Sequence, residues 1–140
     1  METNKSSGLL EEELYELINI KKCANFLDSS LAKRMATADS EGMLYREKSF
    51  FYGFDANRIN PDFPESERIL VQGVIDAYFI EDGDIVLIDY KTDKCSDEYQ
   101  LIEKYKKQLD IYEEALREIT GKKVKERLIY SFCLEKVISL

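Results

Sequence analysis

The 140-residue sequence contains no histidine, only three cysteines and no long apolar run. Without histidine, the chain cannot use imidazole as an acid, a base or a metal ligand. Cys23, Cys95 and Cys133 lie far apart without CxxC spacing, which favours reduced thiols. No apolar run approaches the roughly 18 residues of a membrane span, and the polar first ten residues lack the apolar core of a signal peptide. We therefore expect a cytoplasmic protein without membrane contact.

Basic residues are also in deficit, with 20 lysines and arginines against 28 acidic residues and a formal net charge of −8. Affinity for nucleic-acid phosphates comes mostly from lysine and arginine, so this balance argues against tight, autonomous DNA binding. The objection weakens if a larger partner holds the DNA. The length and the 44% hydrophobic content fit one globular domain over residues 1–140, with residues 1–8 expected to be disordered.

The pattern of apolar residues predicts an α/β sandwich with a mixed sheet. Two or three short helices are expected over 9–17 and 21–35, because apolar residues recur there at helical spacing, with caps at Asn19 and at residues 28–30. A strand is expected over 45–54, followed by a loop over 57–67 that contains both prolines and a hairpin over 68–80 and 84–91. A long helix over 97–120 and two strands over 125–132 and 135–140 complete the predicted fold. Gly121 is placed to end the long helix. The apolar stripe of that helix should pack on the sheet; it consists of Leu101, Tyr105, Leu109, Tyr112 and Leu116.

The hairpin brings two aspartates together. Asp82 and Gly83 between apolar runs are typical of a two-residue turn. Counting six steps from that turn places Asp76 directly opposite Asp89. Side chains alternate along a strand, so Lys91 projects from the same face as Asp89.

Facing carboxylates in an apolar hairpin repel one another and need an explanation. A divalent cation with oxygen ligands removes the repulsion. The simpler alternatives are a pair of strand-end acids in water and, for Lys91, a surface lysine or an ion pair with Asp89. Carboxylates are rarely buried unless paired or bound to metal, which favours the cation.

These residues resemble the PD-(D/E)XK nuclease signature, in which an aspartate precedes a second acid and a lysine. The sequence around them is similar to that of RecB-type nuclease domains: QGVID over 72–76, VLIDYKTD over 86–93, and a Gln-x-x-x-Tyr motif at Gln108 and Tyr112. The segments YREKSF over 45–50, LREITG over 116–121 and LIYSF over 128–132 are similar to the nuclease end of the AddA subunit of bacterial helicase–nucleases. The resemblance runs from about residue 20 to the end of the chain.

The resemblance implies a restriction-endonuclease-like core and a DNA nuclease active in double-strand-break repair and recombination, expected to act as an exonuclease. Asp76, Asp89 and the main-chain carbonyl of Tyr90 would hold Mg²⁺ or Mn²⁺, and Lys91 would position the attacking water. Gln108 and Tyr112 would orient that lysine and the DNA strand. The implied partners are DNA, the helicase portion of a parent subunit, plus a second nuclease subunit.

The chain departs from the family in one respect. RecB-type domains usually carry a metal-ligating histidine on a helix before the core, and this chain has none. Its three cysteines also cannot form the four-cysteine iron–sulfur site of some relatives. Three interpretations stay open: a nuclease domain that is weak or inactive in isolation, a non-catalytic fragment that docks to a partner or DNA, and another metal-dependent hydrolase built on the same hairpin. Glu47 is expected to be a structural strand residue, and Gln108 and Tyr112 could be a solvated amide and a core tyrosine.

Overall fold

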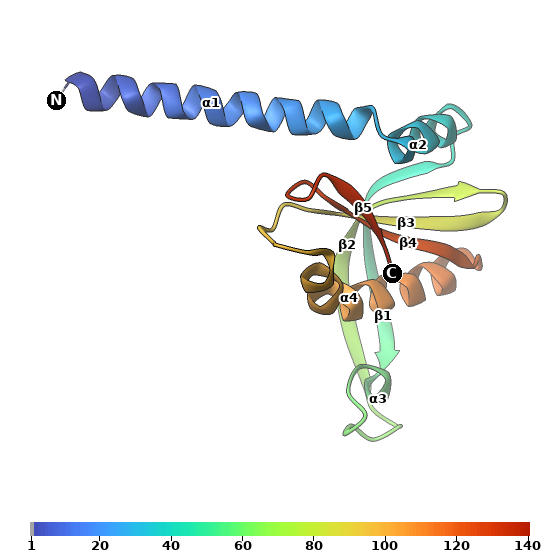
Figure 1. Cartoon of the computed structure of the whole chain (residues 1–140). Coiled ribbons are helices and arrows are strands. Elements are labelled where there is room, and N and C mark those ends of the chain that lie inside the picture. The colour runs from blue at the N-terminus through green and yellow to red at the C-terminus, as the bar shows by residue number, and fades with distance from the viewer. Residues whose placement is uncertain (1) are drawn as a thin grey trace.

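A computed structural model describes the backbone of residues 2–140 and the side chains of residues 11–14 and 16–140. Its elements, shown in Figure 1, are α1 (Glu2–Leu27), α2 (Ser30–Ser40), β1 (Leu44–Asp55), α3 (Ala56–Ile59), β2 (Arg68–Glu81), β3 (Asp84–Lys91), α4 (Glu98–Thr120), β4 (Val124–Ser131) and β5 (Lys136–Ser139). None of the helices in this described part is long and apolar enough to cross a membrane.

The five strands form one mixed sheet in the order β1-β2-β3-β4-β5. Only β3 and β4 run parallel, and the other neighbours are antiparallel. Parallel neighbours need a crossover, which α4 supplies between β3 and β4. The predicted α/β class and mixed central sheet are confirmed.

The core lies on both faces of the sheet. One cluster packs under α4 and includes Leu87, Leu109 and Leu116, while a second packs under α2 and includes Met35 and Ile88. Residues 85–88 of β3 are completely buried, as expected for a central strand covered by helices on both sides.

The long helix α4 forms where the sequence predicts it. The Asp97 carboxylate caps its first turn by accepting a hydrogen bond from the Gln100 amide at 3.1 Å. Gly121 ends the helix in the left-handed region, with φ of 69°, which glycine adopts without strain. Leu101, Leu109, Tyr112 and Leu116 of the predicted stripe are buried against the sheet.

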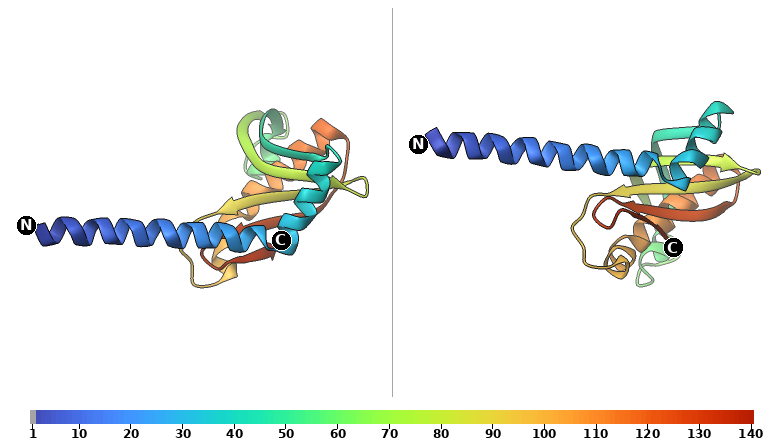
Figure 2. Two further views of the ribbon diagram at one scale, coloured as in Figure 1. Left: turned by 90° about the horizontal axis from the view of Figure 1, so that it is seen from above. Right: turned by 45° about the horizontal axis from the view of Figure 1, so that its top comes forward.

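The first forty residues differ from the prediction. One helix, α1, begins at Glu2 and continues to Leu27, where we expected disorder over 1–8 and a break near residue 19; Met1 lies outside the described residues. The predicted cap at residues 28–30 is confirmed: the chain breaks at Ser29, whose hydroxyl accepts a hydrogen bond from the Ala32 amide and so caps α2. A potential cap such as Asn19 ends a helix only where the chain changes direction, and α1 continues straight away from the sheet (Figures 1 and 2).

The apolar stripe of α1 is uncovered over its outer part. The side chains of Leu14, Leu17 and Ile18 are more than half exposed. The predicted loop over 57–67 also differs at its start, because residues 56–59 form the short helix α3. Ala56 is fully buried there, and its carbonyl accepts a hydrogen bond from the Asn60 amide.

Strands β1 and β2 exchange faces part of the way along their length. Leu44 and Ala77 pack in the cluster under α2, whereas Phe50 and Ile75 pack in the cluster under α4. Leu44 and Phe50 are an even number of residues apart, so regular alternation would place them on one face. The change coincides with Glu47, which has a positive φ of 49°.

Candidate active site

The hairpin has the predicted turn and register. Glu81 pairs with Asp84, and the ladder continues to Ala77 opposite Ile88, so the next positions belong to Asp76 and Asp89. Regular pairing ends there. The Asp76 Oδ2 atom accepts a hydrogen bond from the Tyr90 main-chain amide at 2.8 Å. This carboxylate therefore bridges the two strands at the point where they separate.

Asp89 is the only acidic side chain that is buried among the described residues, with 3% exposure. Its Oδ2 atom lies 3.0 Å from the Lys91 ammonium, yet no donor meets this oxygen with hydrogen-bond geometry. Burial, followed by the adjacent Asp76, raises the pKa of Asp89 to about 6, against the opposing effect of Lys91. Asp89 thus pairs with Lys91 and has a second carboxylate, Asp76, beside it.

Lys91 is held from the other side by α4. Its ammonium donates to the Gln108 Oε1 atom at 3.3 Å, and Gln108 Nε2 donates to the Tyr112 hydroxyl at 2.8 Å. The structure therefore brings all the predicted site residues together in one chain of contacts from Asp76 to Tyr112. Whether they perform the predicted chemistry stays a prediction.

Tyr105 is a contact that the sequence pattern did not reveal. The Lys91 ammonium lies 3.9 Å from the centre of the Tyr105 ring, a cation–π distance. The Tyr105 hydroxyl donates to Asp93 at 2.7 Å, which fixes the ring. The helical period placed Tyr105 on the core stripe, but period alone does not distinguish a core ring from a ring under a lysine.

A packed floor supports the Gln108–Tyr112 pair. The Tyr112 ring meets the Phe50 ring edge-on, with centroids 5.5 Å apart. Gly73 permits this packing, because a Cβ atom at that position would lie 2.8 Å from the Phe50 ring. The glycine of the QGVID segment thus has a steric reason in this fold.

A hollow of about 360 Å³ lies beside the carboxylates, lined by Arg46, Glu47, Asp76 and Tyr90. Burial raises the pKa of Tyr90, and the positive charge of Arg46 opposes that change. We expected only a structural role for Glu47. The pattern of β1 gives no sign of the hollow, because Arg46 and Glu47 look like ordinary exposed strand residues.

The carboxylate pair fits a hard divalent cation in part. Two adjacent carboxylates, one with an oxygen that lacks a hydrogen-bond donor, are suitable oxygen ligands. No group of three or more acidic or cysteine side chains suited to a metal occurs in the described residues. The side chains alone thus offer two ligands, and main-chain oxygens and water would have to complete the shell.

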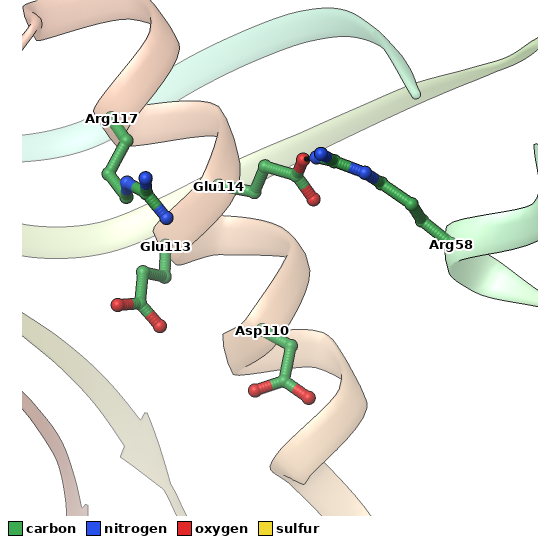
Figure 3. Close-up of a pocket in the computed structure, with 5 residues that line it drawn as sticks. All are labelled: Arg58, Asp110, Glu113, Glu114 and Arg117. Carbon is green, nitrogen blue, oxygen red and sulfur yellow. Dashed lines mark ion pairs between the residues drawn. The ribbon is translucent and has the colours of Figure 1, made fainter. Parts of the chain in front are cut away.

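A second hollow, of about 340 Å³, is of a different kind (Figure 3). It lies against α4 and is lined by Arg58, Asp110, Glu113, Glu114 and Arg117. Its acids are paired with arginines: Arg58 with Glu114, and Arg127 with both Asp110 and Glu113. Paired surface charges of this kind hold α3 and β4 to α4 and leave no carboxylate in need of a cation.

The mixed sheet, the helices on both faces and the position of the carboxylate pair define an α/β protein with a restriction-endonuclease-like core. No protein-family model matches the chain. Curated relatives do match it, and they are AddA subunits of ATP-dependent helicase/nucleases.

The protein from Clostridioides difficile (strain 630) is 37% identical over 145 residues, which cover 95% of this chain and 11% of the relative. The one from Clostridium botulinum (strain Alaska E43 / Type E3) is 42% identical over 134 residues, which cover 93% of this chain and 11% of the relative. The one from Clostridium novyi (strain NT) is 36% identical over 146 residues, which cover 100% of this chain and 12% of the relative. The chain is therefore homologous to a segment of these AddA proteins and spans about a tenth of their length.

Proposed function

We propose that the chain is a metal-dependent DNA nuclease domain that cleaves phosphodiester bonds as part of a helicase/nuclease in double-strand-break repair. The observation that carries this proposal is the buried Asp89 beside Asp76 and Lys91. A buried acid with a raised pKa beside a lysine at a strand end is typical of functional sites. The names of the relatives supply the class of reaction.

Asp76, Asp89 and the Tyr90 carbonyl would hold Mg²⁺ or Mn²⁺, hard ions that prefer oxygen. The ion would stabilise charge that develops on the scissile phosphate and acidify a nearby water. Lys91 would orient that water and offset the phosphate charge through its Nζ atom. Gln108 and Tyr105 restrict the Lys91 side chain, so its ammonium is positioned before the substrate arrives.

The partners would be DNA, the helicase portion of a longer subunit, plus a second nuclease subunit, in the cytoplasm. A DNA strand held by those partners resolves the conflict with the net charge of −8, because this segment would then cut without supplying most of the phosphate contacts. The proposed mode is exonucleolytic.

The test is cleavage of end-labelled linear DNA by the chain in millimolar Mg²⁺, compared with the Asp76→Asn and Asp89→Asn variants. Lys106→Gln is a control, because Lys106 is an exposed residue of α4 outside the site. We expect cleavage by the unaltered chain and the control only. Equal cleavage by all four proteins would show that the carboxylates are not the site.

A non-catalytic docking module is the second candidate. The absence of a third acidic or cysteine ligand among the described side chains favours it. In that case the melting temperature would not respond to Mg²⁺ or Mn²⁺, either in the unaltered chain or in the Asp76 and Asp89 variants. A metal-induced rise that disappears in Asp89→Asn would instead support the nuclease.

A further inference from the structure

The hollow lined by Arg46, Glu47, Asp76 and Tyr90 is directly connected to the carboxylate pair, because Asp76 lines it and also accepts the Tyr90 amide. Its volume of about 360 Å³ falls in the range of small-molecule sites, roughly 300–1,000 Å³. A ligand that reaches the carboxylates therefore has space to extend into this hollow.

Arg46 provides the positive charge of the hollow. The structure records no ion pair for this guanidinium with any described acidic side chain, although Glu47 and Asp76 line the same space. Two arginines elsewhere in the fold differ from it: Arg34 pairs with Glu81, and Arg127 pairs with Asp110. Arg46 thus keeps its donors available at the wall of the hollow.

The distorted backbone of β1 orients this side chain. Arg46 pairs with Ala77 and follows Leu44 by two residues, so it keeps to the sheet face under α2, where the Tyr90 ring packs against Phe26. Glu47 then adopts a positive φ of 49°, a conformation that is uncommon for a non-glycine residue and is often found at functional sites. Beyond it, Phe50 turns to the α4 face and supports Tyr112.

We propose that Arg46 binds a backbone phosphate of the DNA strand, next to the phosphate being cut, and so serves as a substrate-binding residue of this site. The inference rests on the proposed function. A planar guanidinium binds a phosphate with two parallel hydrogen bonds, which suits an anionic backbone. Lys91 on the α4 side and Arg46 on the α2 side would then contact successive phosphates on the two sides of Asp76.

The test measures binding of a fluorescently labelled single-stranded oligonucleotide by anisotropy in Mg²⁺. Lys91→Ala serves as the background, so that the DNA is not cut. Arg46→Gln is compared with Lys48→Gln, which removes one charge from an exposed lysine two residues along the same strand and outside the hollow. We expect Arg46→Gln to weaken binding by about tenfold, the effect of one lost charged hydrogen-bonding contact. Its slope of log affinity against log salt should fall by about 0.7.

Lys48→Gln should change affinity by less than about threefold, because an exposed charge outside the contact contributes little. Equal losses in the two variants, or no loss in Arg46→Gln, would overturn the inference, as would no measurable binding by the Lys91→Ala background. Cleavage by the unaltered chain is scored separately. Its absence, together with DNA binding that depends on Arg46, would contradict the nuclease function and leave the phosphate contact standing.

Discussion

The two ends of the β2–β3 hairpin treat their acidic residues in opposite ways. At the turn end, Glu81 accepts hydrogen bonds from Arg34 at 2.8 Å and from Lys125 at 3.0 Å. These two cations, Arg34 first, lower the pKa of Glu81 to about 2. At the open end, Asp89 pairs with Lys91 and lies beside a second acid, Asp76. Burial raises the pKa of Asp89 to about 6.

The contrast separates a structural site from the proposed functional site within a single hairpin. Two cations around one half-buried acid stabilise the folded chain and attach α2 and β4 to the turn. A buried acid with one lysine and a second acid beside it leaves negative charge uncompensated, which costs stability unless a cation or proton is added. Uncompensated charge of this kind is expected where a ligand is meant to bind.

The largest expected effect is on chemistry at the open end. Lys91→Ala should lower the rate of DNA cleavage at least about 100-fold, because a positioned cation next to the reacting phosphate is lost. The rate is measured on end-labelled linear DNA at saturating Mg²⁺, with Lys106→Ala as the exposed control. An unchanged rate in Lys91→Ala would show that the open end of the hairpin does not take part in cleavage.

At the turn end, the largest effect is on stability. Glu81→Ala should destabilise the fold by about 1–2 kcal/mol, because Arg34 and Lys125 lose their shared acceptor while Arg34 keeps Glu126. Urea unfolding measures the change. Asp82→Asn is the control: the Asp82 carboxylate is almost fully exposed and 3.9 Å from Lys125, and asparagine tolerates the positive φ of 54° at this position. Losses of equal size would show that the turn end does not depend on Glu81.

Asp89→Asn should change the stability of the fold in the opposite direction to Glu81→Ala. Removing one of two facing carboxylates should leave the metal-free fold intact or stabilise it by about 1 kcal/mol at pH 7. The variant should also show a smaller rise in melting temperature with Mg²⁺ or Mn²⁺. An equal metal-induced rise in both proteins would place the bound ion elsewhere.

The smallest effect is a pH dependence. The folded-state pKa of Asp89 is raised from 3.8 to about 6, so the folded chain binds the proton more tightly than the unfolded chain. Stability in metal-free buffer should therefore fall as pH rises from about 4 to 6, by about 1 kcal/mol or less between pH 5 and 7. For Glu81 the pKa is lowered from 4.5 to about 2, and its contribution is lost as pH falls through that range.

The check is chemical unfolding in EDTA at pH 5 and pH 7, for the unaltered chain and for Asp89→Asn. The variant should lack the decrease between the two values. A decrease of the same size in both proteins would assign the pH dependence to another group.

Much of this hairpin and its site follows from the sequence alone. The Asp82-Gly83 turn sets a two-residue loop, and the period-2 alternation then determines which residue faces Asp89. The end of α4 is likewise determined by the local sequence, because Gly121 adopts the left-handed conformation that terminates the helix. The four-residue spacing of Gln108 and Tyr112 places them on one side of α4, where they contact each other.

Other features depend on the tertiary structure, because they arise from contacts between segments distant in the sequence. The exchange of faces at Glu47 reflects packing of β1 and β2 against two different clusters, which no strand period encodes. The cation–π contact of Lys91 with Tyr105 needs α4 to cross over β3 at one particular height. The hollow beside Arg46 likewise exists only where β1 lies next to the end of the β2–β3 hairpin. The raised pKa of Asp89 exists only once the helices and the sheet have excluded water from this carboxylate.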